Sequence, residues 1–254
     1  MNKYILITGI NGYLAKRILF YITNFTSFEV IGLDIHEESE DITIDSYNLG
    51  LKFYFKCDLR VEQSIKETIN SFSNRNIFPV VLINNAAIDS IPKNNSKSTG
   101  LEFDSFDDIF SVNVKAPIIL ARYFSEYWVN NSIKGNIINI TSIYSIVSPD
   151  PNIYSSGFVK NIFYGASKAA FNSVTQQLAV IFAKSGIKVN SLLLGGVISD
   201  KQDEYFQMNY KNRIPIGRFL EVEEIFDAIY MLLSEKNSYM TGSIIKIDGG
   251  YTLI

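Results

Sequence analysis

The sequence has 254 residues, of which 47% are hydrophobic and 19% charged, so we expect one large globular α/β domain, residues 1–254, and exclude a disordered chain. The net charge of −3, without a long basic run, gives no electrostatic footprint for nucleic acid. No apolar run approaches the length of a membrane span, the N-terminus lacks a signal-peptide pattern, and the single cysteine, Cys57, fits a reducing cytoplasm. We expect neither nucleic-acid nor membrane partners and assign no metal site.

The first predicted strand, residues 4–7, is continuous, apolar and stopped by Gly9. A glycine turn then leads into a helix that begins near Tyr13. Such a turn aims backbone N–H groups and the helix dipole at an anion, typically a pyrophosphate. A plain strand-to-helix turn would also use glycines. Because the turn in this chain follows the first strand of an alternating β/α pattern, a dinucleotide site is favoured. The residues assigned to this site are Thr8, Gly9, Asn11, Gly12, Tyr13 and Leu14.

The second predicted strand, residues 29–34, ends in Asp34, which lies 25 residues after Gly9. An acid at this position typically accepts hydrogen bonds from the adenosine ribose. Because a carboxylate there repels a 2′-phosphate, we predict NAD(H) in preference to NADP(H). His36, the only histidine, follows in an acidic loop and is interpreted as a solvated residue.

A third strand is predicted at residues 53–59 and an amphipathic helix at 62–75. Asp58, followed by Leu59, could accept a hydrogen bond from an adenine amino group or serve as a plain helix N-cap, and the spacing does not separate these alternatives. A fourth strand, 80–87, ends in polar and small residues that let the backbone pass close to a ligand. These are Asn85, Ala86 and Ala87; residues 89–100 are predicted to form a polar loop.

The second half is predicted to begin with a long helix at 106–132 that contains Asn113, either a core hydrogen-bonding residue or a site residue. The fifth strand, 136–142, ends at Ser142, where α/β sheets build their ligand crevice. An irregular segment, 143–163, follows. Further elements are a sixth strand (188–194), a break that includes Gly196 and Val197, a polar region (199–213) within a lid region assigned to 197–213, a helix (221–233) and a last strand (243–247).

Tyr164 and Lys168 open a helical pattern that runs to about residue 184. A helix places residues four apart on one face, so the phenol and the ammonium can face one pocket. For the phenol to exchange protons near neutrality, its pKa must fall by roughly three units. This requires about 4 kcal/mol of preferential stabilisation of the phenolate, which a nearby ammonium in a partly desolvated site can supply. The pair alone is a weak signal, because this spacing is frequent on ordinary helices.

Taken together, these motifs resemble the short-chain dehydrogenase/reductase family along essentially the whole chain. The matching pieces are Thr8-Gly9-x-x-Gly12, Asp34, Asp58-Leu59, Asn84-Asn85-Ala86, Asn113, Ser142, Tyr164-x-x-x-Lys168 and Ile247-Asp248-Gly249-Gly250. The resemblance implies a Rossmann-type doubly wound sheet of seven parallel strands in the order 3-2-1-4-5-6-7, with helices on both faces. It also implies a dinucleotide across the switch point, and a dimer or tetramer formed through the helices at 106–132 and 164–184.

The resemblance assigns roles to the catalytic candidates. Tyr164 would act as general acid and base, and Lys168 would hold the nicotinamide ribose and lower the pKa of Tyr164. Ser142 would polarise the substrate carbonyl, and Asn113 would support a proton-relay water through a local helix distortion. The backbone at Gly196 and Val197 would approach the nicotinamide amide.

Three departures from the family pattern stand out. The glycines at 9 and 12 with Ala15 have a spacing more like that of nucleotide-sugar epimerases and dehydratases. Leu194-Gly195 replaces a common Pro-Gly, and the segment 143–163 is longer than usual. This long insert resembles that of bacterial oxidoreductases of flagellin modification and surface-sugar synthesis, including nonulosonic acid pathways. It suggests a sugar phosphate, an activated sugar or a related polyol as the small-molecule substrate.

Three functions therefore compete. The first is an NAD-dependent dehydrogenase or reductase that acts on a sugar-derived hydroxyl or ketone. The second is a sugar epimerase that oxidises and re-reduces its substrate within one turnover, suggested by the glycine spacing. The third is a catalytically silent cofactor-binding scaffold, against which the intact Ser142, Tyr164 and Lys168 argue.

Overall fold

The computed structural model describes residues 3–89, 99–154, 159–198 and 202–254. Seven parallel strands form one sheet in the order β3-β2-β1-β4-β5-β6-β7. They are β1 (Tyr4–Thr8), β2 (Glu29–Asp34), β3 (Phe53–Lys56), β4 (Pro79–Asn84), β5 (Asn136–Ser142), β6 (Lys188–Leu194) and β7 (Ile244–Ile247). The predicted fold class and strand order are confirmed. The order reverses between β1 and β4, where sheets of this kind open a crevice at their C-terminal edge.

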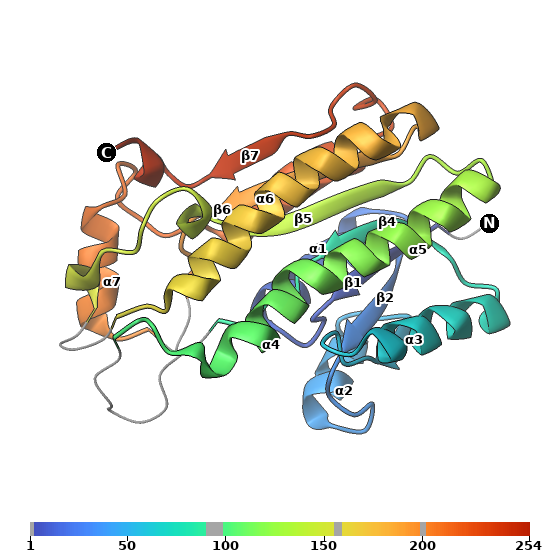
Figure 1. The fold of residues 1–254 in the computed structure, drawn as a ribbon, viewed down its shortest axis with the longest axis horizontal. Coiled ribbons are helices and arrows are strands. Elements are labelled where there is room, and N and C mark those ends of the chain that lie inside the picture. The colour runs from blue at the N-terminus through green and yellow to red at the C-terminus, as the bar shows by residue number, and fades with distance from the viewer. Residues whose placement is uncertain (1–2, 90–98, 155–158, 199–201) are drawn as a thin grey trace.

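Helices cover both faces of this sheet (Figure 1). They are α1 (Tyr13–Phe25), α2 (Asp41–Asn48), α3 (Glu62–Arg75), α4 (Phe106–Phe110), α5 (Ala116–Asn130), α6 (Ile162–Phe182), α7 (Glu204–Asn212) and α8 (Val222–Leu233). In Figure 1, α3, α5 and α6 cross in front of the sheet and α1 lies behind it. Among the described residues, none of these helices combines the length and apolar character needed to cross a bilayer.

The alternation of side chains along β1 divides the core into two layers, because successive residues of a strand point to opposite faces. Ile5 and Ile7 pack in one buried cluster with residues of α1 and α8. Leu6, between them, packs in the other cluster with residues of α3 and α5, including the fully buried Trp128. A strand that is buried on both faces reads as a continuous apolar run, which is why β1 was recognisable in the sequence.

The long helix predicted at 106–132 is interrupted, which corrects the sequence interpretation. Helix α4 leads into a π-helical turn, Ser111–Lys115, before α5 begins, and α5 ends at Asn130. The helix predicted to begin at Tyr164 begins at Ile162, because the Asn161 side chain accepts a hydrogen bond from the Phe163 N–H (2.9 Å) and caps the helix. Tyr164 therefore lies in the first turn of α6.

Several other boundaries differ from the predictions. Strands β3 and β4 end at Lys56 and Asn84, so the residues that follow them form loops at the sheet edge. Helix α2 was not predicted, because its short polar sequence lacks an apolar period. Helix α7 lies inside the polar region predicted as a lid.

The segment 143–163 is less irregular than predicted in its described part. It contains 3₁₀ turns at Ile143–Ser145 and Pro151–Ile153, and Ile143 and Ile153 are buried. Both belong to a third apolar cluster together with Tyr210 of α7 and Tyr251 near the C-terminus. The insert and α7 are thereby packed against the end of the sheet. Residues 90–98 of the predicted polar loop, 155–158 of the insert and 199–201 of the lid region lie outside the described residues.

Candidate active site

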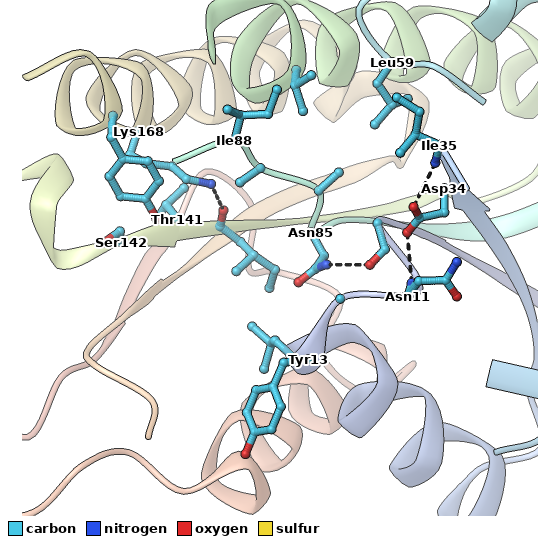
Figure 2. Close-up of a pocket in the computed structure, with 18 of the residues that line it drawn as sticks. Asn11, Tyr13, Asp34, Ile35, Leu59, Asn85, Ile88, Thr141, Ser142 and Lys168 are labelled. Atoms are coloured by element: carbon cyan, nitrogen blue, oxygen red, sulfur yellow. Dashed lines mark hydrogen bonds between the residues drawn. The ribbon is translucent and has the colours of Figure 1, made fainter. Parts of the chain in front are cut away.

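A cavity of about 710 Å³ lies at the C-terminal ends of the strands around the switch point. Its volume is within the range of small-molecule and cofactor sites. The predicted residues that line it are Gly9, Asn11, Gly12, Tyr13, Leu14, Asp34, Asp58, Leu59, Asn85, Ala86, Ala87, Ser142, Tyr164, Lys168 and Val197. Figure 2 shows Thr141, Ser142 and Lys168 at one end of this site and Asn11 and Asp34 at the other. We call these the substrate side and the cofactor side.

The glycine turn on the cofactor side requires its glycines. Gly9 has φ +67°, and a Cβ atom there would lie 2.9 Å from the Cα of Ala86. The hydroxyl of Thr8 accepts hydrogen bonds from the N–H groups of Asn85 and Ala86, both at 3.0 Å. Thr8 is buried, is not among the residues lining the cavity and joins β1 to the loop after β4, and its contact with the cofactor stays a prediction.

Asp34 fixes the conformation of the same turn. Its carboxylate accepts from the N–H of Asn11 (2.9 Å) and from the N–H of Ile35 (2.8 Å), as Figure 2 shows. The side chain of Asn11 in turn accepts from the hydroxyl of Ser46 in α2 at 2.8 Å. His36 lines the cavity and contacts Glu40 through Nδ1 at 2.9 Å, and its side chain remains 42% exposed.

Asp58 is engaged by a residue that the sequence reasoning missed. The guanidinium of Arg60 donates to both carboxylate oxygens of Asp58, from Nε at 2.9 and 3.2 Å and from a terminal nitrogen at 2.7 Å. This bidentate contact lowers the pKa of Asp58. The N-cap alternative is wrong, because the N-cap of α3 is Val61. Asp58 also lines the cavity, and its contact with an adenine amino group stays a prediction.

The substrate side brings together residues from β5 and α6. Ser142 is the last residue of β5, and Tyr164 and Lys168 lie one helical turn apart in α6. The Lys168 ammonium donates to the carbonyl oxygen of Ile140 at 3.0 Å and lies 5.8 Å from the centre of the Tyr164 ring. Three groups that hold or transfer protons therefore face one end of the cavity.

The pKa values of these groups correct one expectation. Burial raises the pKa of Tyr164, and the charge of Asp89 adds to this effect, whereas a hydrogen bond with Ser142 opposes it. Burial also lowers the pKa of Lys168 to about 8. A lowering of the phenol pKa by Lys168 is therefore not found among the protein groups, because burial and the charge of Asp89 raise this pKa.

Asn113 does not line the cavity, although it lies next to Val112, which does. It is buried in the π-helical turn, so the expected helix distortion is present at this residue. Its amide accepts from the N–H of Ile88 (2.8 Å) and donates to the carbonyl of Ile88 (3.0 Å) and to the hydroxyl of Ser167 (3.0 Å). The side chain thereby joins the loop after β4 to α6, and the proton-relay water remains a prediction.

Gly196 also lies outside the cavity lining, although Val197 is part of it. A Cβ atom at Gly196 would lie 2.5 Å from the ring of Tyr210 in α7, so this glycine permits close packing of the helix. Sequence reasoning also missed several lining residues. They are Ile35, Arg60, Val112, Thr141 and Leu194. Their one common signal is that each is within two residues of an assigned residue or of a strand end.

Within the described ranges of the chain, no group of three or more His, Cys, Asp or Glu side chains could hold a metal ion.

Comparison with known proteins gives matches along nearly the whole chain. A family model described as enoyl-(acyl carrier protein) reductase matches residues 26–252. An uncharacterized oxidoreductase of Thermotoga maritima is 31% identical over 266 residues, which covers 100% of this chain and 98% of the relative. An L-xylulose reductase of Caenorhabditis elegans is 35% identical over 181 residues, which covers 69% of this chain and 67% of the relative.

Solved structures are similarly close. A short chain dehydrogenase from Leptospira borgpetersenii with bound NAD⁺ has a TM-score of 0.84 and 29% identity, with 99% of this chain and 93% of that chain covered. A 4-hydroxyisoleucine dehydrogenase complexed with NADH has a TM-score of 0.84 and 29% identity, with both chains fully covered. ElxO with NADP bound has a TM-score of 0.81 and 26% identity, again with both chains fully covered.

Proposed function

The chain belongs to the short-chain dehydrogenase/reductase family and is an oxidoreductase with an NAD-binding fold. From this premise we propose that it transfers hydride between NAD(H) and a hydroxyl or ketone of a small, sugar-derived substrate. The observation that carries the proposal is a single cavity with Ser142, Tyr164 and Lys168 at one end and the glycine turn with Asp34 at the other.

The cofactor side fits a dinucleotide. The glycine turn leads directly into α1, whose first residue follows Gly12, so backbone N–H groups can meet a pyrophosphate without an intervening side chain. The carboxylate of Asp34 stands where it would accept from a ribose hydroxyl and repel a 2′-phosphate, which supports NAD(H) over NADP(H). A bound nicotinamide supplies the ring that exchanges hydride and, in its oxidised form, a positive charge that favours the phenolate of Tyr164.

The protein's own groups handle the proton. The Ser142 hydroxyl and the Tyr164 phenol hold the reacting oxygen of the substrate, and the proton moves between that oxygen and Tyr164 Oη. Lys168 holds the nicotinamide ribose, and its ammonium keeps a positive charge beside the phenol. The insert follows Ser142 directly and packs with α7 in the third apolar cluster.

Two features support a sugar-derived substrate. The L-xylulose reductase relative acts, by its name, on a sugar. The insert 143–163 resembles that of oxidoreductases in surface-glycan and nonulosonic acid biosynthesis, so we place the reaction in that kind of pathway, with a sugar phosphate, an activated sugar or a related polyol as substrate.

We also propose a homodimer or homotetramer formed through α5 and α6. These helices lie side by side on one face of the sheet (Figure 1) and expose large apolar side chains to solvent. The side chains are Ile118 and Val129 on α5 and Val180 and Ile181 on α6. Sedimentation of the purified protein tests this, and a monomer at micromolar concentration would contradict it.

The function is tested by NADH-linked screening against sugar phosphates, CMP- and UDP-activated sugars and polyols, followed by Tyr164→Phe. Removing the phenol hydroxyl should lower kcat by roughly 10²–10⁴-fold while NADH binding persists, because a positioned general acid contributes about that much. Full turnover by Tyr164→Phe would contradict the proposal. A change of stereochemistry without net NADH would instead favour the epimerase.

A further inference from the structure

A charged pair adjoins the proposed acid–base tyrosine. Asp89 follows Ile88, which lines the cavity, and Lys160 precedes Tyr164 by one helical turn of sequence. The Lys160 ammonium forms an ion pair with the Asp89 carboxylate. The same ammonium lies 4.8 Å from the centre of the Tyr164 ring and 5.3 Å from that of Tyr144. Neither residue of the pair is among those that line the cavity, but the pair adjoins Tyr164 and Ile88, which do.

The pair is partly withdrawn from water. The side chain of Lys160 is 12% exposed and that of Asp89 is 34% exposed. The Asp89 carboxylate is close enough to act electrostatically on both Tyr164 and Lys168. Ion pairs that are withdrawn from water add little net stability, because desolvation offsets much of their attraction. The position of this one is therefore better explained by recognition than by stability.

We propose that Asp89 and Lys160 bind a hydroxyl of the substrate on the carbon next to the one that reacts. The carboxylate of Asp89 accepts a hydrogen bond from this hydroxyl, and the ammonium of Lys160 donates one to it. The proposal rests on the proposed function and narrows its substrate to a compound with vicinal hydroxyls, or a hydroxyl beside a carbonyl.

The pair presents a hydrogen-bond acceptor next to a hydrogen-bond donor, and this arrangement favours a hydroxyl over other polar groups. Each hydroxyl is both donor and acceptor, so it can bridge a carboxylate and an ammonium without adding charge. A substrate carboxylate or ammonium at this place would be attracted by one member of the pair and repelled by the other, so it would lose its hydration without a net electrostatic gain. A methylene group at this place would displace water from Asp89 and Lys160 without offering either of them a hydrogen bond in its place.

The test uses D-glucose, 2-deoxy-D-glucose and D-glucosamine, which carry at C2 a hydroxyl, no polar group and an ammonium. Their binding to the protein–NADH complex is measured by calorimetry, and their oxidation by NADH formation. The unmodified protein should favour glucose over the other two by roughly 10- to 100-fold, since hydrogen bonds to charged groups are worth that much. Asp89→Asn and Lys160→Met should each remove most of this preference, mainly through KM, while binding of NADH stays unchanged.

Lys16→Met is the matched control, because Lys16 is also a largely buried lysine, and it pairs with Asp45 at 3.2 Å between α1 and α2. It should keep the full preference for glucose. Equal binding of glucose and 2-deoxyglucose, binding of none of the three sugars, or an unchanged preference in both variants would overturn the proposal. Selective binding without turnover would leave it standing and count against the proposed reaction, whereas turnover without selectivity would do the reverse.

Discussion

The cofactor side and the substrate side differ in the contacts that fix their loops, although the cofactor side also holds a side-chain pair, Asp58 with Arg60. On the cofactor side, side chains bind backbone groups at neighbouring strand ends, as Thr8 binds the N–H of Asn85 and Asp34 binds the N–H of Asn11. On the substrate side, side chains from separate loops bind each other, as Asp89 binds Lys160 and Asp150 binds Arg213. Strand order fixes the first kind of contact, whereas the second kind depends on the paths of two loops.

This difference explains which side can change its ligand. A backbone partner remains when a neighbouring side chain is replaced, so the cofactor side keeps its shape through many substitutions. A pair of side chains is lost when either partner changes. The substrate side can therefore acquire a new specificity at little cost to the fold, in line with function being placed on loops over a rigid scaffold.

The largest effect is expected from Lys168→Met, at the junction of the two sides. Turnover should fall by roughly 10²-fold or more, because the ammonium beside the phenol is lost. Stability should rise by about 2 kcal/mol at pH 7, because burial that lowers the pKa of Lys168 to about 8 means that its charged form destabilises the native state. The loss of the hydrogen bond to Ile140 is included in this figure.

The difference in stability between the unmodified protein and Lys168→Met should decrease as the pH rises. Below pH 8 the lysine is charged in both the native and unfolded states, so its full cost is present. Between pH 8 and the ordinary value of 10.5 the native state loses the proton first, so the stability of the unmodified protein rises and the gap to Lys168→Met narrows. Urea unfolding at pH 7 and pH 10 measures the gap. The exposed Lys184→Met should change stability by less than about 0.5 kcal/mol. A gap that widens with pH would contradict the argument.

An intermediate effect is expected from Asp34→Asn on the cofactor side. The amide oxygen can still accept from the Asn11 N–H, but the charge that repels a 2′-phosphate is lost. The preference for NADH over NADPH should therefore fall by at least about 10-fold, or 1.4 kcal/mol. Fluorescence titration of both cofactors measures it. Asp41→Asn, which removes an exposed charge from α2, is the control, and an unchanged ratio in Asp34→Asn would refute the predicted cofactor preference.

The smallest effect is expected from Arg213→Ala on the substrate side. The pair with Asp150 joins α7 to the insert, and its side chains are 42% and 24% exposed. Exposed pairs contribute little, so the free energy of unfolding should fall by no more than about 1 kcal/mol. Substrate KM should rise a few-fold, roughly 2- to 5-fold, with unchanged binding of NADH, as steady-state kinetics and titration would show. If Arg213→Ala weakened cofactor binding more than substrate binding, the assignment of this pair to the substrate side would be contradicted.

Much of the cofactor side was predictable because its elements carry local signals. The apolar run of β1, the glycines at 9 and 12, and Asp34 at the end of β2 each imply a position relative to the strand before them. The order of seven strands followed from the family resemblance and is confirmed. Arg60 was missed because its bond to Asp58 depends on the path of a short loop that no spacing rule describes.

The substrate side was less predictable for physical reasons. The apolar cluster of Ile143, Ile153 and Tyr210 forms only when the insert meets α7, so the insert appeared irregular in sequence. The raised pKa of Tyr164 reflects burial and the charge of Asp89, which is far from Tyr164 in the sequence. Neither cause follows from the spacing of Tyr164 and Lys168. Asn161 caps α6 from a position before the first apolar repeat, and this placed the predicted helix start two residues late.

The π-helical turn at Ser111–Lys115 determines which residues of the following helix, α5, face the interior. One additional residue in a turn rotates the downstream surface by about 100°. With this rotation Phe124 and Trp128 point into the interior, where the indole N–H of Trp128 donates to the carbonyl of Pro79 at 2.7 Å. An uninterrupted α-helix of the same sequence would bring other residues to the interior in place of these two rings. The turn also buries Val112 and Asn113, so the same five residues set both the facing of α5 and the contact with the loop after β4.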